Sequence, residues 1–185
     1  MKNRLAAYLS KNTVLSHEII NAIVDTAVFK SYEKGTIIQE HACFLVLKGC
    51  IRSYLAKDGE EKTIEFYTEE QPVSSLRFDI NDVPDYFFEC IEDTDVCLGA
   101  NEKENDIFIR FPEFESACRI MAEKLMTSYK TEFANYKIAS AKDRYLKLQE
   151  ENPDLIQRVP QYQLASYLGI KPETLSRIRR KINKK

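Results

Sequence analysis

Polar side chains that can read nucleic-acid bases are concentrated near the C-terminus, in the stretch PQYQLASYLGIKPETLSRIRRKI (residues 160–182). Its second half carries carboxylate, hydroxyl and guanidinium groups, which hydrogen-bond with base edges and phosphates. The candidate DNA-binding residues are Glu173, Thr174, Ser176, Arg177, Arg180, Lys181 and Lys184. Among them Arg177 is the main candidate for base recognition, because its planar fork can bond two acceptors on one guanine edge.

Two short helices joined by a tight turn are needed to position these groups. Pro160 suits the start of a helix, because the N–H that proline lacks would be unpaired there. Gly169 follows at the point where that helix must stop, and Pro172 suits the start of the second helix. The pattern predicts a helix-turn-helix. An αα-hairpin with a basic surface is the alternative that the local pattern leaves open.

The distribution of charge supports contact with a polyanion. Residues 140–185 hold eleven Lys/Arg and five Asp/Glu, a net charge of +6, so residues 1–139 carry −8 of the total of −2. A basic segment on an acidic body predicts that the C-terminal part meets a polyanion.

The preceding part of the chain is predicted to be mostly β-structure. A short amphipathic helix is expected over residues 16–26, with Ser16 as its N-cap. From residue 29 to 100, short β-rich runs alternate with turns, and Asp58-Gly59 between two such runs predicts a hairpin. We therefore expect an α+β protein with an N-terminal β-roll or sandwich.

A long amphipathic helix is predicted after Pro112, because apolar residues recur there at steps of three and four up to Tyr136. This stripe lies wholly against the β-domain or pairs with a second copy, and we favour a homodimer. The expected dimer contacts are Cys118, Met121, Leu125 and Tyr129. A further helix is expected from Ser140 to Glu151, ending before Asn152-Pro153.

Catalytic and metal sites are not predicted. The five cysteines form no CxxC pair, and we interpret them as reduced core thiols, while His17 and His41 stand alone. No nucleophile-base arrangement or phosphate-binding glycine loop is present, which argues against an enzyme and against a resident cofactor. The absence of an apolar run of ~18 residues or of a signal-peptide core favours a cytoplasmic protein.

The stretch ASYLGIKPETLSRIRRK resembles the helix-turn-helix of Crp/Fnr transcription regulators, and RYLKLQEENPDLIQRVPQ upstream fits the same family. LVLKGCIRSYLAKDGEEKTIEFY (residues 45–67) is similar, less specifically, to the family's β-roll. The resemblance implies a cyclic-nucleotide-binding-like jelly roll over residues 1–111, a dimerisation helix over 112–137 and an all-α DNA-binding domain over 138–185. It also implies base contacts by Glu173 and Arg177, while Pro172 occupies a third contact position that often holds Arg.

Two departures from the family pattern affect the expected ligand contacts. Members that bind cyclic AMP hold its phosphate with a G-E-L segment and a following R-S-A or R-T-A. Here the equivalent positions are Ser74 and Ser75, with Arg77 as a lone cation and Asp85 where arginine is expected, so we predict no response to cyclic AMP. The chain also ends soon after the second helix, so we expect phosphate contacts from Arg179, Arg180, Lys181, Lys184 and Lys185.

The sequence thus predicts a sequence-specific regulator that binds double-stranded DNA. Further candidate partners are an unidentified small-molecule effector, which the β-roll would bind, and RNA polymerase. The alternative is a small-molecule-binding sensor module in which the C-terminal segment is only structural. Saturable ligand binding without retention of DNA would favour that alternative.

Overall fold

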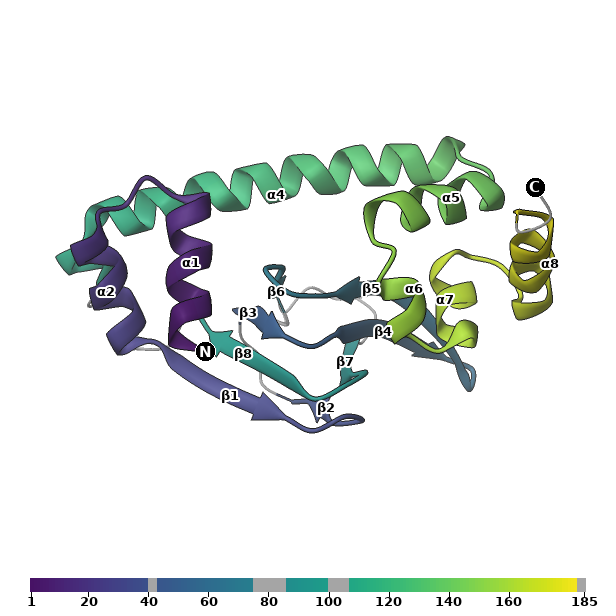
Figure 1. Ribbon diagram of the computed structural model, residues 1–185, viewed down its shortest axis with the longest axis horizontal. Helices are drawn as coiled ribbons and strands as arrows, with labels where there is room; N and C mark the ends of the chain where they lie inside the picture. The colour runs from purple at the N-terminus through teal and green to yellow at the C-terminus, as the bar shows by residue number, and fades with distance from the viewer. Residues whose placement is uncertain (40–42, 75–85, 100–106, 183–185) are drawn as a thin grey trace.

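A computed structural model describes residues 1–39, 43–74, 86–99 and 107–182 (Figure 1). Two N-terminal helices, α1 (Lys2–Asn12) and α2 (His17–Thr26), precede the β-structure. The strands are β1 (Val28–Tyr32), β2 (Ile37–Ile38), β3 (Cys43–Lys48), β4 (Ile51–Lys57), β5 (Glu60–Tyr67), β6 (Pro72–Ser74), β7 (Tyr86–Cys90) and β8 (Thr94–Leu98). The C-terminal helices are α4 (Pro112–Ile138), α5 (Ala141–Glu151), α6 (Leu155–Arg158), α7 (Gln161–Tyr167) and α8 (Pro172–Ile182).

The strands form two four-stranded antiparallel sheets, in the orders β1-β8-β3-β6 and β2-β7-β4-β5. Apolar side chains from both sheets fill the space between them: Ile38, Phe44, Val46, Ile51, Val73, Phe88, Cys90 and Val96. The predicted hairpin joins β4 to β5, and both turn residues have positive φ, 54° at Asp58 and 79° at Gly59. This conformation is the one that an Asp-Gly pair favours in a two-residue hairpin. The predicted α+β class and β-roll are confirmed.

The long helix α4 connects the two ends of the molecule. Figure 1 shows α1 and α2 near its N-terminal end and α5 to α8 near its C-terminal end, with the sheets beneath it. It has 27 residues, and none of its side chains is fully buried. Its first turns pack on α1 and α2 through Phe114, whereas its C-terminal half is largely exposed. None of the described helices is long and apolar enough to span a membrane.

The helices largely follow the sequence prediction. Helix α2 begins where expected, with the Ser16 hydroxyl accepting a hydrogen bond from the N–H of Ile19. Helix α5 begins after Ser140, which forms a capping box with Asp143. Helix α4 ends at Ile138, one residue beyond the predicted dimerisation helix. Helices α1 and α6 were not predicted.

Candidate nucleic-acid interface

Helices α7 and α8 form the predicted helix-turn-helix, and its inner face is a continuous apolar core. Leu164 and Ala165 of α7 are fully buried, and Leu175 of α8 is 1% exposed. Ile178 and Ile182 pack partly buried against the same cluster. Burial of one side of α8 leaves the opposite side facing outward.

The outward side of α8 carries the residues predicted to contact DNA. Thr174 is half-buried and Lys184 lies outside the described residues, whereas the other five candidates are exposed: Glu173, Ser176, Arg177, Arg180 and Lys181. At 100° per residue, Glu173, Arg177 and Arg180 lie within a narrow arc of the helix surface. A carboxylate and two guanidinium groups therefore project together from one exposed helix face.

A groove between α5 and α8 borders this face. It is lined by Lys142, Leu146, Thr174, Arg177, Ile178, Lys181 and Ile182. Three of these side chains are cationic, and together they favour an anion such as a backbone phosphate. The groove therefore extends the positive surface from α8 towards the start of α5.

The turn between α7 and α8 requires glycine. Gly169 has φ +68°, a conformation that residues with a Cβ rarely adopt. A Cβ at this position would also lie 2.5 Å from the hydroxyl oxygen of Tyr136, near the end of α4. The turn therefore packs directly against the long helix.

The helix-turn-helix is packed against the β-roll as well. A single apolar cluster joins Cys50, Phe66 and Ile91 of the roll to Tyr145, Leu155 and other side chains of the C-terminal helices. Phe66 meets Tyr167 of α7 edge to face, with 5.5 Å between ring centroids. The N–H of Thr63 donates to the Ser166 hydroxyl at 3.0 Å. These contacts hold α7 against strand β5.

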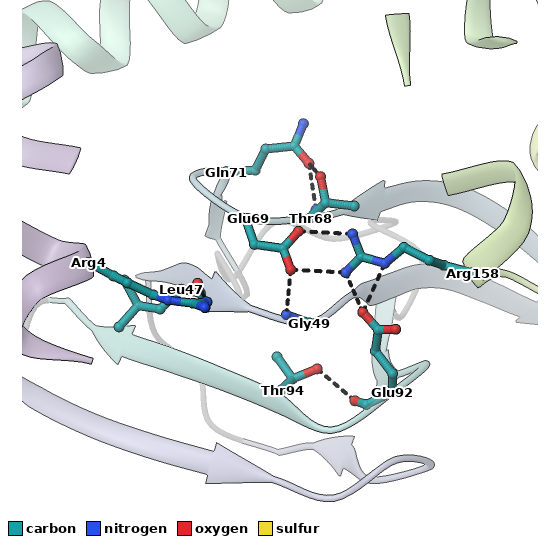
Figure 2. A network of polar contacts seen from close by, with 9 residues as sticks. All are labelled: Arg4, Leu47, Gly49, Thr68, Glu69, Gln71, Glu92, Thr94 and Arg158. Atoms are coloured by element: carbon teal, nitrogen blue, oxygen red, sulfur yellow. Dashed lines mark hydrogen bonds and ion pairs between the residues drawn. The ribbon is translucent and has the colours of Figure 1, made fainter. Parts of the chain in front are cut away.

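An ion-pair network makes a second connection between the roll and the C-terminal helices (Figure 2). Arg158, at the end of α6, donates to both carboxylate oxygens of Glu69, at 2.9 and 3.0 Å, and its Nε donates to Glu92 at 3.0 Å. Glu69 also accepts from the N–H of Gly49 at 2.9 Å. Partial burial alone would raise the Glu69 pKa, but the hydrogen bonds from Arg158 and Gly49 lower it. The carboxylate is therefore held in its charged form.

Glu65 lies where β5, α4 and α7 meet. Its carboxylate accepts from the N–H of Phe66 at 3.1 Å and from the hydroxyl of Tyr167. Burial raises the pKa of Glu65 to about 7, and the charge of Glu132 on α4 adds to the rise, although the two hydrogen bonds oppose it. This carboxyl group therefore titrates near neutral pH at the junction of the roll, the long helix and the helix-turn-helix.

The architecture is shared with known regulators, although no family model and no curated protein matches the sequence. A mutant of CooA from Carboxydothermus hydrogenoformans is 19% identical, with a TM-score of 0.62 over 97% of this chain and 84% of its own. The c-di-GMP-responsive global regulator CLP from Xanthomonas campestris is 14% identical, with a TM-score of 0.63 over 91% of this chain and 92% of its own. The Thermus thermophilus catabolite activator protein is 19% identical, with a TM-score of 0.52 over 92% and 85%.

The chain has the Crp/Fnr fold. At these identities the likeness shows the fold alone. Within this fold the described residues include the β-roll, the long helix and the helix-turn-helix, and their order along the chain matches the order that the sequence resemblance implies.

The positions that hold cyclic nucleotides in some Crp/Fnr proteins are not placed here. Ser75, Arg77 and Asp85 lie outside the described residues, and Ser74 ends strand β6 without a described side chain. Among the described residues, no group of three or more His, Cys, Asp or Glu side chains is arranged to hold a metal ion.

The four residues predicted for the dimer contact lie on α4 in different environments. Cys118, Met121 and Leu125 are half-buried, and Met121 approaches the chain's own Tyr8, with 4.0 Å between Sδ and the hydroxyl oxygen. Tyr129 is 41% exposed. Beside them runs an exposed apolar groove lined by Ala122, Leu125, Met126, Tyr129, Lys130 and Phe133. Phe133 belongs to the apolar stripe that the sequence indicated, whereas Met126, one residue after Leu125, was not singled out from the sequence.

Proposed function

We propose that the chain is a sequence-specific, dimeric regulator that binds double-stranded DNA through α8. The observation that carries this proposal is the exposed arc of Glu173, Arg177 and Arg180 on a helix whose other side is buried. In a helix-turn-helix, the second helix enters the major groove with such a face. The proposal agrees with the known regulators among the proteins that share the fold.

The roles of the individual side chains follow from their chemistry. Arg177 would bond the O6 and N7 acceptors of a guanine, and Glu173 would accept from a cytosine amino group. Lys181 and Arg180 would meet phosphates, together with Lys142 across the groove. Base recognition and backbone contact would thus come from adjacent parts of one surface.

Dimerisation would come from α4. Ala122, Met126, Tyr129, Phe133 and Tyr136 follow one another at steps of 4, 3, 4 and 3 residues, which is the spacing of a coiled-coil seam. Met126 and Phe133 are 61% and 64% exposed, so a large apolar area is available to a second copy. Two copies paired in this way would present two α8 helices to a two-fold-symmetric site.

Cyclic AMP is not part of the proposed mechanism. Ser74 and Ser75 stand where cyclic-AMP-binding members have Gly-Glu, and Asp85 stands where they have arginine. A carboxylate in place of a guanidinium would repel the cyclic phosphate. We therefore propose regulation by another effector or by the amount of protein.

The test compares base recognition with backbone contact. Selection from a random duplex pool should yield a two-fold-symmetric motif. Arg177→Ala should then cost about 1–3 kcal/mol on the selected site and much less on random DNA. Lys181→Ala, the matched control on the same helix, should weaken both about equally and reduce the salt slope by about one. Lys184→Ala is expected to behave like Lys181→Ala. Equal losses on both duplexes for Arg177→Ala would exclude α8 as the reading helix.

A further inference from the structure

One guanidinium group joins the end of the long helix to the turn of the helix-turn-helix. Arg144, in the first turn of α5, donates from Nη1 to the carbonyl of Ala139 at 2.8 Å. The same side chain donates from Nη2 and Nε to the carbonyl of Leu168, at 2.9 and 3.2 Å. Ala139 follows the last residue of α4, and Leu168 follows the last residue of α7. Both acceptors are carbonyls at helix C-termini, which lack partners within their own helices.

The contact suits arginine better than any other cation. The C-terminal ends of α4 and α7 both present partial negative charge, and a cation between them is favoured. Arginine supplies five N–H donors in a fixed planar fork, so its position is defined by both helix ends at once. Lysine has three donors on a flexible stem and cannot reproduce this geometry.

Tyr136 completes the joint from the other side. The Arg144 guanidinium lies over the Tyr136 ring, with 4.5 Å from Cζ to the ring centroid. The Tyr136 hydroxyl lies against Gly169, where only a residue without a Cβ fits. Helix α8 begins at Pro172, three residues after this glycine. The end of α4 and the start of α8 are therefore connected through two side chains and one turn.

Between α4 and α5 only Ala139 and Ser140 are non-helical, and both have extended backbone. Rotation about these two residues would change the angle between the long helix and the DNA-binding helices. Arg144 spans this joint, since its partner Ala139 lies within it and its partner Leu168 lies beyond it.

We propose that Arg144 is a positioning residue that fixes the orientation of α8 relative to α4 and thereby sets the half-site spacing that the dimer accepts. This rests on the proposed function, because α4 lies at the two-fold axis only if the chain pairs through it. In a symmetric helix-turn-helix dimer, the separation of the two recognition helices determines the spacing of the half-sites. A side chain that fixes the angle at the joint fixes that separation, without touching DNA itself.

The experiment measures spacing preference. The selected half-site is placed twice in a set of duplexes whose separation varies by one base pair at a time, and once alone. The wild type should prefer one separation by at least tenfold. Arg144→Met should reduce that preference to less than threefold while its Kd for the single half-site stays within twofold of wild type. Arg144→Lys, which keeps the charge, should also lose the preference.

Lys147→Met is the matched control, because Lys147 lies on the same helix and pairs with Glu151 at the surface, 3.6 Å away. It should keep the wild-type spacing preference. An unchanged preference in Arg144→Met, or an equal loss of affinity for all duplexes including the single half-site, would overturn the proposal.

A second measurement separates this inference from the proposed function. The N–H groups of Gly169 and Ile170 donate to the carbonyls of Ser166 and Ala165 in the turn. Hydrogen exchange of these amides should be at least fivefold faster in Arg144→Met than in Lys147→Met. If wild type binds no duplex specifically, the proposed function and the half-site claim fail together. Hydrogen exchange then still shows whether Arg144 fixes the turn. Equal exchange rates of the Gly169 and Ile170 amides in Arg144→Met and Lys147→Met would overturn the claim that Arg144 holds the turn in place.

Discussion

Replacing Glu65 by glutamine tests how the buried carboxyl group between the roll, α4 and α7 makes the free energy of unfolding depend on pH. In the folded chain the Glu65 pKa is raised to about 7, whereas an unperturbed glutamate has a value of 4.5. Between these two pH values the unfolded chain releases a proton that the folded chain retains. The free energy of unfolding therefore falls as pH rises from about 4.5 to about 7, and this contribution is constant above that range. Raising a pKa by this amount corresponds to about 3 kcal/mol.

Glutamine reproduces the shape of the protonated carboxyl and does not titrate. The stability of Glu65→Gln relative to wild type should therefore rise by about 2–3 kcal/mol between pH 5 and pH 8. The tyrosines around Glu65 do not titrate in this window, because burial raises the pKa values of Tyr67, Tyr129 and Tyr167 above the ordinary tyrosine value. In the part of the chain that the structure describes, the charged group that adds to the rise of the Glu65 pKa is Glu132 of α4, and it is present in both proteins.

Urea unfolding at one protein concentration, repeated from pH 5 to pH 8, provides the measurement. Glu60→Gln is the control, because Glu60 is exposed on the β4–β5 hairpin and pairs only with Lys62 in the described structure, at 3.2 Å. Its pH profile should follow that of wild type. If Glu65→Gln and wild type lose the same stability between pH 5 and pH 8, Glu65 does not titrate as its surroundings indicate.

Three further predictions concern the dimer, the ion-pair network and the effector. Met126→Glu combined with Phe133→Glu should give a monomer by sedimentation at micromolar concentration. Lys124→Glu, on the opposite side of α4, should leave the dimer intact. A monomeric wild type would refute dimerisation through α4. Arg158→Ala should lower the free energy of unfolding by about 2 kcal/mol, a value between those of exposed and buried ion pairs. The Arg158 side chain is 23% exposed, and its partners Glu69 and Glu92 are 39% and 35% exposed. An unchanged urea midpoint would show that the network does not contribute to stability. Calorimetry with cyclic AMP and cyclic GMP should show no micromolar binding, and a measurable isotherm would mean that other residues replace the missing phosphate ligands.

Local signals in the sequence were sufficient to predict the helix-turn-helix. Pro160, Gly169 and Pro172 each mark a helix boundary through their own backbone chemistry, and the buried side of each helix follows from apolar spacing. Asp58-Gly59 identified its hairpin for the same reason. Helix α1 was missed because only Leu5 and Leu9 are buried and no side chain caps its start. Two buried residues four apart are too weak a pattern to separate a helix from a polar terminus.

The residues that hold the C-terminal helices in place could not be found from local patterns. Arg158 meets Glu69 and Glu92, which lie 89 and 66 residues away along the chain. Arg144 bonds backbone carbonyls, which carry no sequence signature. The raised pKa of Glu65 depends on burial by two helices that come later in the chain. In each case the interaction exists only once separate elements of the fold have packed together.

The shared apolar cluster has a consequence for protein engineering. Cys50, Phe66 and Ile91 belong to the roll by sequence, yet they complete the core of the C-terminal helices. A chimaera that grafts residues 138–185 onto another sensor would leave Tyr145 and Leu155 facing a foreign surface, and a fragment of the same residues would expose them to water. A working chimaera would also need the three roll residues at the equivalent positions of the new sensor, and carboxylates that replace Glu69 and Glu92 as partners of Arg158. The smallest exchangeable piece of this molecule is therefore the outward face of α8, where new base contacts can be installed without disturbing what holds the helix in place.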